Sequence, residues 1–223
     1  MHAVIVAGGD TDPADARHLA GADLVIAADG GAAFLEAIGR RPDMLVGDLD
    51  SVDAALAKRL AAAGVAVERH PAAKDATDAE LAIDRAVDAG ARRITVIGAF
   101  AGKRLDHELA NLLLLTDRAW ATATDDLRMV RGGTTVRALH GPGRLEIEAG
   151  PGATVSLLPL GGDAAGVATT GLRFPLNGEP LRLGRSRGLS NEVVEPRASV
   201  ALEAGVLLVV ETDTESALEG VEA

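Results

Sequence analysis

The chain has 223 residues, 48% of them hydrophobic, which is enough to bury a core in one large domain or two smaller ones. Its 22 basic and 33 acidic residues give a net charge of −11, which disfavours binding to nucleic acid or to an anionic membrane. Without cysteine, a signal-like leader or about 18 consecutive apolar residues, the sequence predicts a soluble, cytoplasmic protein that lacks disulfides and thiolate metal sites.

The first half of the chain alternates predicted strands and helices. Short β-branched runs bounded by Gly, Asp or Pro predict strands at 3–7, 24–28, 44–46, 65–68 and 94–97. The stretches between and after them predict helices at 13–19, 32–38, 53–63, 78–89 and 105–120. Thr77 and Glu80 have capping-box spacing at the fourth of these helices, and Gly90 follows its end. The alternation predicts an α/β fold with a mostly parallel sheet flanked by helices.

Helical periodicity ends near Asp126, and short alternating runs follow it. In RLEIEA (144–149), Leu145 and Ile147 share one face of a strand, and further strands are predicted at 154–158, 192–194, 200–202 and 207–211. These runs predict a smaller, all-β, sandwich-like domain. We therefore expect an α/β domain at 1–123, a linker near 121–126, a β domain at 127–213 and a frayed acidic tail at 214–223.

Polar clusters follow each of the five predicted strands of the first domain. They contain Gly8 to Asp10, Asp29 to Gly31, Gly47 to Ser51, Lys74 to Asp78 and Gly102 to His107. In an open parallel sheet, ligands bind outside the carboxyl ends of the strands, where the loops and helix starts gather. The five clusters are therefore expected to meet at one edge of the sheet.

Aspartates dominate that edge. Asp48 and Asp50 stand two apart after a strand, and Asp75 and Asp78 stand three apart near a helix start, so each pair can share a face. Two like charges about 4 Å apart cost roughly 4 kcal/mol at an effective dielectric of about 20. A hard divalent cation would relieve this repulsion, and Mg²⁺ with a nucleotide fits best because Lys74 and Arg104 stand nearby to contact phosphate oxygens.

Structural roles compete with this reading for some residues. Asp78 could be a helix cap, His107 a charge at a helix start, and Phe174 a core side chain. Arg104, Glu108 and Asn111 share one stripe of their predicted helix, which favours contact with a phosphate or leaving group. The sequence contains no P-loop, GxGxxG, HExxH or GxSxG motif.

With these residues assembled, the chain resembles the thiamine pyrophosphokinase (thiamine diphosphokinase) family. The resemblance spans nearly the whole chain and is carried by seven blocks in family order. They are AADGGAAFL (27–35), RPDMLVGDLDS (41–51), KDATDAELAI (74–83), RLDHELAN (104–111), SLLPL (156–160), GLRFPL (171–176) and GLSNE (188–192). The resemblance implies a homodimer that holds thiamine between subunits and transfers pyrophosphate from ATP to the thiamine hydroxyl, leaving AMP.

The resemblance also implies roles for individual residues. Asp48, Asp50 and Asp75 would hold Mg²⁺; Asp75, Asp106 and Arg104 would be catalytic, with Asp75 or Asp106 as the proton acceptor. Phe174, Ser190 and Asn191 would form the thiamine side. The ATP side would comprise Asp29, Gly30, Gly31, Lys74, Thr77, Asp78, Arg104 and Asn111.

The chain departs from the family pattern at two places. The loop GAFAGK before Arg104 is one residue longer than the usual GATGG-like stretch, and Phe174 stands where Trp or Tyr is common. Three other functions remain open: a pyrophosphokinase for another hydroxymethyl heterocycle such as a pterin, a nucleotide or thiamine sensor without catalysis, and a DxD-type sugar-nucleotide transferase.

Overall fold

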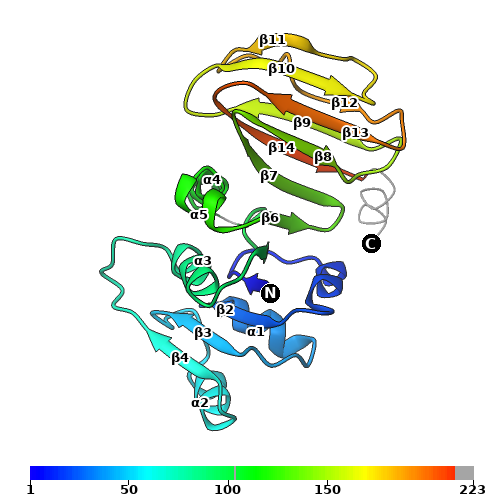
Figure 1. Ribbon diagram of the computed structural model, residues 1–223. Helices are drawn as coiled ribbons and strands as arrows, with labels where there is room; N and C mark the ends of the chain where they lie inside the picture. The colour runs from blue at the N-terminus through cyan, green and yellow to red at the C-terminus, as the bar shows by residue number, and fades with distance from the viewer. Residues whose placement is uncertain (103, 214–223) are drawn as a thin grey trace. The chain divides into compact units, whose positions relative to one another are not determined.

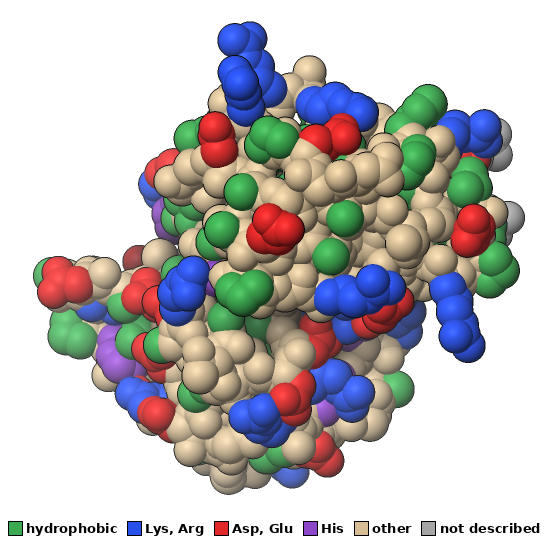
Figure 2. Space-filling view, turned by 45° about the horizontal axis from the view of Figure 1, so that its top comes forward, with side chains coloured by type: hydrophobic (Ala, Val, Ile, Leu, Met, Phe, Trp, Pro, Cys, Tyr) green, Lys and Arg blue, Asp and Glu red, His purple; other side chains and the backbone are tan. Residues whose placement is uncertain are grey.

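The computed structural model describes residues 1–102 and 104–213 (Figure 1). Its contacts divide the chain into two compact units, Met1–Arg131 and Gly132–Ala223. Lys103, part of the longer loop, and the predicted tail 214–223 lie outside the described residues. No described helix is long and apolar enough to cross a membrane. Basic and acidic side chains are interspersed on the face shown in Figure 2.

The first unit is built on a parallel sheet, which confirms the predicted α/β class. Its strands lie in the order β6-β5-β1-β2-β3-β4, and each neighbouring pair is parallel. They span β1 (His2–Val6), β2 (Leu24–Ala28), β3 (Met44–Gly47), β4 (Ala66–Arg69), β5 (Arg93–Ile97) and β6 (Asp126–Arg131). Val6 is level with Ala27 of β2 and Ile97 of β5, so the carboxyl ends of the central strands reach the same edge.

Helices cover both faces of this sheet. They are the 3-10 helix η1 (Pro13–Leu19), α1 (Gly31–Ala37), α2 (Ala54–Ala62), α3 (Asp78–Asp88), α4 (Leu105–Leu114) and α5 (Arg118–Ala123). One core cluster joins Leu35 of α1 and Leu56 of α2 to Val4 and Val25 of the sheet. Side chains alternate along a strand, so Ile5 points to the opposite face, where α3 contacts β1, β2 and β3.

The structure differs from the sequence prediction where the first unit ends. The predicted helix 105–120 is interrupted, because Asp117 caps a new helix by accepting hydrogen bonds from the backbone of Ala119 and Trp120. The stretch expected to be a linker contains the end of α5 and the start of β6, which pairs with β5. The two units therefore meet between Arg131 and Gly132, later than the loss of helical periodicity suggested.

The second unit contains two antiparallel sheets that share one core, which confirms the smaller β domain. One sheet has the order β12-β9-β14-β7 and the other β11-β10-β13-β8. Their strands are β7 (Thr134–His140), β8 (Gly143–Ile147), β9 (Thr154–Pro159), β10 (Ala164–Thr170), β11 (Asn177–Leu181), β12 (Asn191–Glu192), β13 (Ala198–Leu202) and β14 (Val206–Thr212). Leu157 and Leu207 from the first sheet pack in one cluster with Leu181 and Val200 from the second.

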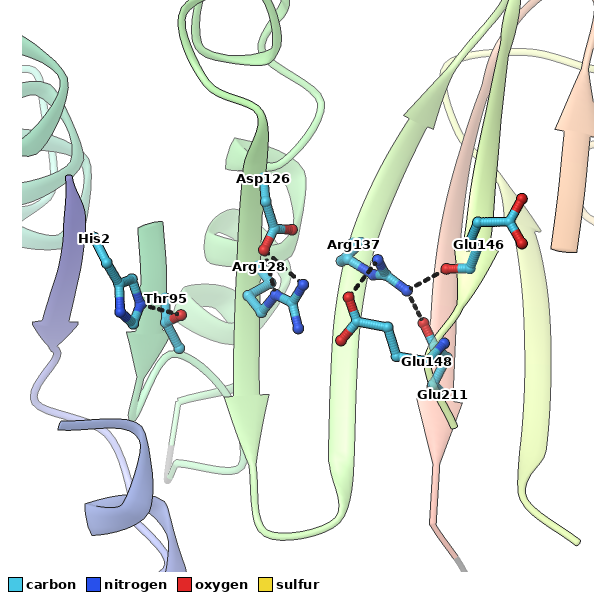
Figure 3. A network of polar contacts seen from close by, with 8 residues as sticks. All are labelled: His2, Thr95, Asp126, Arg128, Arg137, Glu146, Glu148 and Glu211. Carbon is cyan, nitrogen blue, oxygen red and sulfur yellow. Dashed lines mark hydrogen bonds and ion pairs between the residues drawn. The ribbon is translucent and has the colours of Figure 1, made fainter. Parts of the chain in front are cut away.

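A buried polar network fastens the two sheets of this sandwich (Figure 3). Arg137 of β7 contacts the carboxylate of Glu211 on β14, and it donates to the carbonyl of Glu146 on β8 at 2.9 Å. Glu211 also accepts hydrogen bonds from the backbone of Glu148 and Ala149 at 2.7 and 2.9 Å. The buried charges are thus paired and hydrogen-bonded, as burial requires.

Candidate active site

A cavity of about 660 Å³ lies at the carboxyl edge of the sheet in the first unit. Each of the five predicted polar clusters contributes to its wall, including Gly9, Gly30, Asp48, Thr77 and Gly102. The start of α4 closes another part of the wall with Arg104, His107, Glu108 and Asn111. The arrangement matches the expectation that strand ends of a parallel sheet gather a ligand site.

Close backbone packing shapes this edge. A Cβ atom at Gly31 would lie 1.8 Å from the carbonyl oxygen of Val6, and one at Gly9 would lie 2.4 Å from that of Gly98. Only glycine permits strand ends and helix starts to approach so closely. Asp29 at the end of β2 adopts φ = 43° and Leu49 in the loop after β3 adopts φ = 66°, which are unusual for residues with side chains. Tertiary contacts therefore hold these loops in conformations that their own preferences would not select.

Three aspartates converge in this cavity: Asp29 after β2, Asp48 after β3 and Asp78 at the start of α3. One carboxylate oxygen from each of Asp29, Asp48 and Asp78 lies within 4.8 Å of the others. Gly47 makes the convergence possible, since a Cβ atom there would lie 2.9 Å from Oδ1 of Asp78 and 3.1 Å from Cβ of Asp29. We call these three carboxylates the aspartate trio.

The electrostatics of the aspartate trio favour a bound cation. Burial raises the pKa of Asp29, and the neighbouring Asp78 and Asp48 raise it further, while a hydrogen bond from Ser51 lowers it. Oδ1 of Asp29 is buried and has no hydrogen-bond partner within the described residues. A buried carboxylate oxygen without a partner is costly unless a cation meets it. Three oxygen ligands at this spacing fit Mg²⁺, which keeps several waters and uses few carboxylates.

Lys74 is the cation closest to the aspartate trio within the described residues. Its Nζ atom lies 2.5 Å from Oδ1 of Asp78 and 3.5 Å from Oδ2 of Asp48. Burial lowers the pKa of Lys74, but the carboxylates of Asp78 and Asp48 raise it more, so the net shift is upward. A backbone hydrogen bond from Asp50 and the contact with Lys74 lower the pKa of Asp48. The ammonium group thus neutralises part of the negative charge.

The predicted metal ligands Asp48, Asp50 and Asp75 are not grouped in this way. Asp50 lines the cavity, where its carboxylate accepts a hydrogen bond from the Ser51 hydroxyl at 3.1 Å. Asp75 is exposed and does not line the cavity that the described residues form. Asp78 takes the corresponding place in the aspartate trio, and Thr77, not Asp78, caps α3 by accepting from the backbone of Glu80 at 3.2 Å. The competing capping role of Asp78 is therefore filled by its neighbour.

Arg104 and Asp106 form an exposed bidentate pair at the start of α4. Nε of Arg104 lies 3.0 Å from one carboxylate oxygen of Asp106, and a terminal nitrogen lies 2.5 Å from the other. The hydrogen bonds from Arg104 are the main cause that lowers the pKa of Asp106 to about 2. Such a carboxylate is a weak base near neutral pH. Arg104 lines the cavity and Asp106 does not, so the pair orients a guanidinium toward the ligand space.

The depressed pKa of Asp106 predicts a specific titration. The stabilising charge of Asp106 is present above its ordinary pKa of 3.8, and it is lost as pH falls through about 2. In Arg104→Gln, carboxyl-detected NMR should show Asp106 titrating close to 3.8, because its hydrogen-bond donor is gone. Arg118→Gln, at another exposed helix start, should leave the low value unchanged. A normal pKa in the wild-type protein would contradict the pairing.

Asn111 anchors the loop that leads into α4. Its buried side-chain nitrogen donates to the carbonyl of Ala99 at 2.7 Å, while the residue also lines the cavity. Asn111→Ala should lower the free energy of unfolding by about 2 kcal/mol, because the Ala99 carbonyl loses its donor. Urea denaturation measures the loss, with the exposed Asn177→Ala as the control. Equal losses in the two variants would show that the bond contributes little.

Several cavity residues were not among the predicted site residues. They include Gly8, Gly9, Asp10, Ser51, His107 and Glu108. The sequence allows His107 to be only a charge at a helix start, but His107 lines the same cavity as Arg104. Their position in the sequence could have indicated them, because each belongs to a polar cluster that follows a predicted strand or to the stripe of α4 that contains Arg104 and Asn111. Gly31 and Asp106, which were predicted, support the wall without lining it in the described structure.

The predicted thiamine-side residues lie together in the second unit. The side chain of Asn191 accepts from the backbone nitrogen of Phe174 at 3.0 Å and donates to its carbonyl at 2.7 Å. Ser190 adopts φ = 55°, and its backbone nitrogen donates to the Ser156 hydroxyl at 3.0 Å. The Phe174 side chain is 57% exposed, so it is not part of the core of this unit. Asn191 therefore anchors the backbone of the exposed Phe174.

Comparisons with known proteins agree on one family for both units. The model of "Thiamin pyrophosphokinase, catalytic domain" matches residues 16–124, and that of "Thiamin pyrophosphokinase, vitamin B1 binding domain" matches residues 144–207. The thiamine pyrophosphokinase of Bacillus subtilis (strain 168) is 29% identical over 188 residues, covering 84% of this chain and 86% of the relative.

Solved structures give the same result. The crystal structure of thiamine pyrophosphokinase from Bacillus subtilis has a TM-score of 0.85 and 28% identity, covering 96% of this chain and 100% of that one. The structure from Geobacillus thermodenitrificans has a TM-score of 0.81 and 29% identity, covering 97% and 100%.

Proposed function

The chain belongs to the thiamine pyrophosphokinase family, and on that premise we propose that it transfers a pyrophosphoryl group from ATP to the hydroxyl of thiamine. The observation that carries the proposal is the aspartate trio, set in a cavity whose wall also holds Lys74 and Arg104. Carboxylates for a divalent cation and basic groups for phosphate oxygens are the parts that phosphoryl transfer requires.

In the proposed reaction, the thiamine hydroxyl oxygen attacks the β-phosphorus of ATP. The bond from that phosphorus to the α,β-bridging oxygen breaks, AMP leaves with this oxygen, and the hydroxyl proton passes to a base. Asp29, Asp48 and Asp78 would hold Mg²⁺, which would supply charge neutralisation to the phosphates. Arg104 and Lys74 bind phosphate oxygens, and Asn111 fixes the loop beneath them. The low pKa of Asp106 favours an orienting role for that residue over that of the base.

We propose that Phe174, Ser190 and Asn191 form the thiamine side. Thiamine carries a cationic thiazolium ring, and an exposed aromatic face attracts a cation. Phe174 presents such a face, with its backbone clamped on both sides by the amide of Asn191. The left-handed backbone at Ser190 places its side chain in a conformation that a regular strand would not give.

We also propose a homodimer that holds thiamine between subunits. Both units carry exposed apolar side chains: Leu105, Leu109 and Leu113, at four-residue spacing on α4, are 67%, 54% and 53% exposed, and Phe174 is exposed in the second unit. Sedimentation should therefore give about twice the chain mass of 22.7 kDa. Leu109→Lys should shift the protein toward monomer and weaken thiamine binding, whereas Ile38→Lys should not. A fully active wild-type monomer would contradict this arrangement.

One incubation tests the proposed reaction. The protein, ATP, Mg²⁺ and thiamine should yield AMP and thiamine diphosphate in equal amounts, detected by chromatography. Neither product should form without the metal. Binding of both ligands without AMP release would instead identify a sensor, and faster turnover of a hydroxymethylpterin would identify a different acceptor. Absence of both products across several divalent metals would reject the proposal.

A further inference from the structure

Lys74 forms ion pairs with the aspartate trio, and a role in phosphate binding alone does not explain them. Its ammonium group contacts Asp78 at 2.5 Å and Asp48 at 3.5 Å, which are two members of the aspartate trio. The side chain is 14% exposed, so it lies against the wall and does not extend into solvent. The third member, Asp29, makes no ion pair with another described residue. Lys74 therefore provides the trio's positive charge within the described protein.

A divalent cation and this ammonium group compete for the same oxygens. Mg²⁺ binds carboxylate oxygens at about 2.0–2.1 Å, and an ammonium nitrogen within hydrogen-bond distance of the same oxygen would lie next to the ion. Both are strongly repelled at such a separation. The four-carbon stem of lysine is flexible, and Lys74 lines the cavity in which phosphates would bind. The ammonium group could therefore bind phosphate oxygens after a metal ion displaces it.

We propose that Lys74 holds the cation position of the aspartate trio in the metal-free protein and moves to the nucleotide phosphates when a divalent cation binds. This inference rests on the proposed nucleotide site. A metal ion that binds alone must displace the ammonium group of Lys74 and leaves it without a new partner. A metal ion that binds together with a polyphosphate provides phosphate oxygens to which the ammonium group can bind. Lys74 is thus a positioning residue that makes metal binding and nucleotide binding reinforce each other, by the same factor in both directions.

Metal binding in the absence of nucleotide tests the proposal most directly. Mn²⁺ can be titrated by electron paramagnetic resonance into wild type, Lys74→Met, Lys74→Arg and the exposed-lysine control Lys58→Met. Lys74→Met should bind Mn²⁺ at least about tenfold more tightly than wild type, because a competing cation has been removed. A non-hydrolysable ATP analogue should strengthen Mn²⁺ binding in wild type but only slightly in Lys74→Met. Lys74→Arg and Lys58→Met should behave like wild type.

Unchanged or weaker Mn²⁺ binding by a folded Lys74→Met variant would overturn the proposal. If circular dichroism shows that this variant does not fold, side-chain ¹⁵N NMR of lysine in the wild-type protein replaces it. The Nζ signal of Lys74 should shift when Mg²⁺ and the analogue are added together, and an unmoved signal would overturn the inference. Product formation with no effect at Lys74 would reject this inference and keep the proposed function. Tighter metal binding in Lys74→Met, together with no product from the wild-type protein, would do the reverse.

Discussion

Asp78→Asn is expected to lower kcat/KM about 1,000-fold, because it removes one of the three carboxylates that would hold the divalent cation. A weakly held cation would neutralise less of the phosphate charge in the reaction. Asp75→Asn should lower kcat/KM by less than about tenfold, since the exposed Asp75 carboxylate does not line the described cavity. Steady-state assays with ATP, Mg²⁺ and thiamine compare two isosteric substitutions only three residues apart.

The two aspartate variants distinguish two possible metal sites. The family resemblance implies Asp48, Asp50 and Asp75, whereas the geometry favours Asp29, Asp48 and Asp78. Circular dichroism should show both variants folded, so a difference in rate reports on the site itself. A much larger loss in Asp75→Asn than in Asp78→Asn would restore the first assignment and exclude the trio as the metal centre.

Gly31→Ala is expected to lower the free energy of unfolding by about 3 kcal/mol or more. The added Cβ atom would lie 1.8 Å from the carbonyl oxygen of Val6 and 2.5 Å from its carbonyl carbon. Both atoms belong to the backbone of the central strand β1, which cannot move aside as a flexible side chain can. Guanidinium denaturation measures the loss, and activity should fall with it because Ala7, just after β1, and Gly30, just before α1, both line the cavity.

Gly102→Ala is the control for this steric effect. At Gly102 the nearest heavy atom to an added Cβ is 3.7 Å away, which is an ordinary contact, so its stability should stay within about 0.5 kcal/mol of wild type. If both substitutions cost the same, collision with Val6 would not account for the effect, because the lower backbone freedom of alanine in the unfolded chain would stabilise both variants.

The location of the site could be predicted from the sequence because it depends on topology. Short β-branched strands alternating with helices required a parallel sheet, and a parallel sheet places its strand ends at one edge. Asp29, Asp48, Lys74 and Arg104 were placed at that edge from this rule, and the cavity contains all of them. The assignment needed no side-chain geometry.

The membership of the aspartate trio could not be predicted in the same way. Asp75 and Asp78 are three residues apart, and the sequence does not show which of them turns inward at a helix start. The choice depends on Thr77, which caps α3, and on Gly47, which leaves room for the Asp78 carboxylate. The resemblance implies Asp29 as an ATP-side residue and not as a metal ligand, and the contact that adds it to the trio comes from a neighbouring strand, which the sequence does not show.

The boundary between the units was displaced for a related reason. Leu127 to Arg131 has no helical periodicity, so the sequence groups it with the β domain, although it belongs to β6, which pairs in parallel with β5. Strand partners are set by tertiary pairing, and periodicity alone does not reveal them. The break between α4 and α5 was missed because Leu112 to Leu115 continues an apolar run up to the capping residue Asp117.

The left-handed backbone at Asp29, Leu49 and Ser190 affects which substitutions would stabilise this protein. Selection for stability alone would place glycine or asparagine at such positions, since these residues adopt the conformation at lower cost. At Asp29 and Ser190 that exchange would remove a carboxylate or a hydroxyl from a proposed binding loop. We expect stabilising consensus or design procedures to favour these exchanges, so Asp29 and Ser190 should be held fixed when a more robust catalyst is sought.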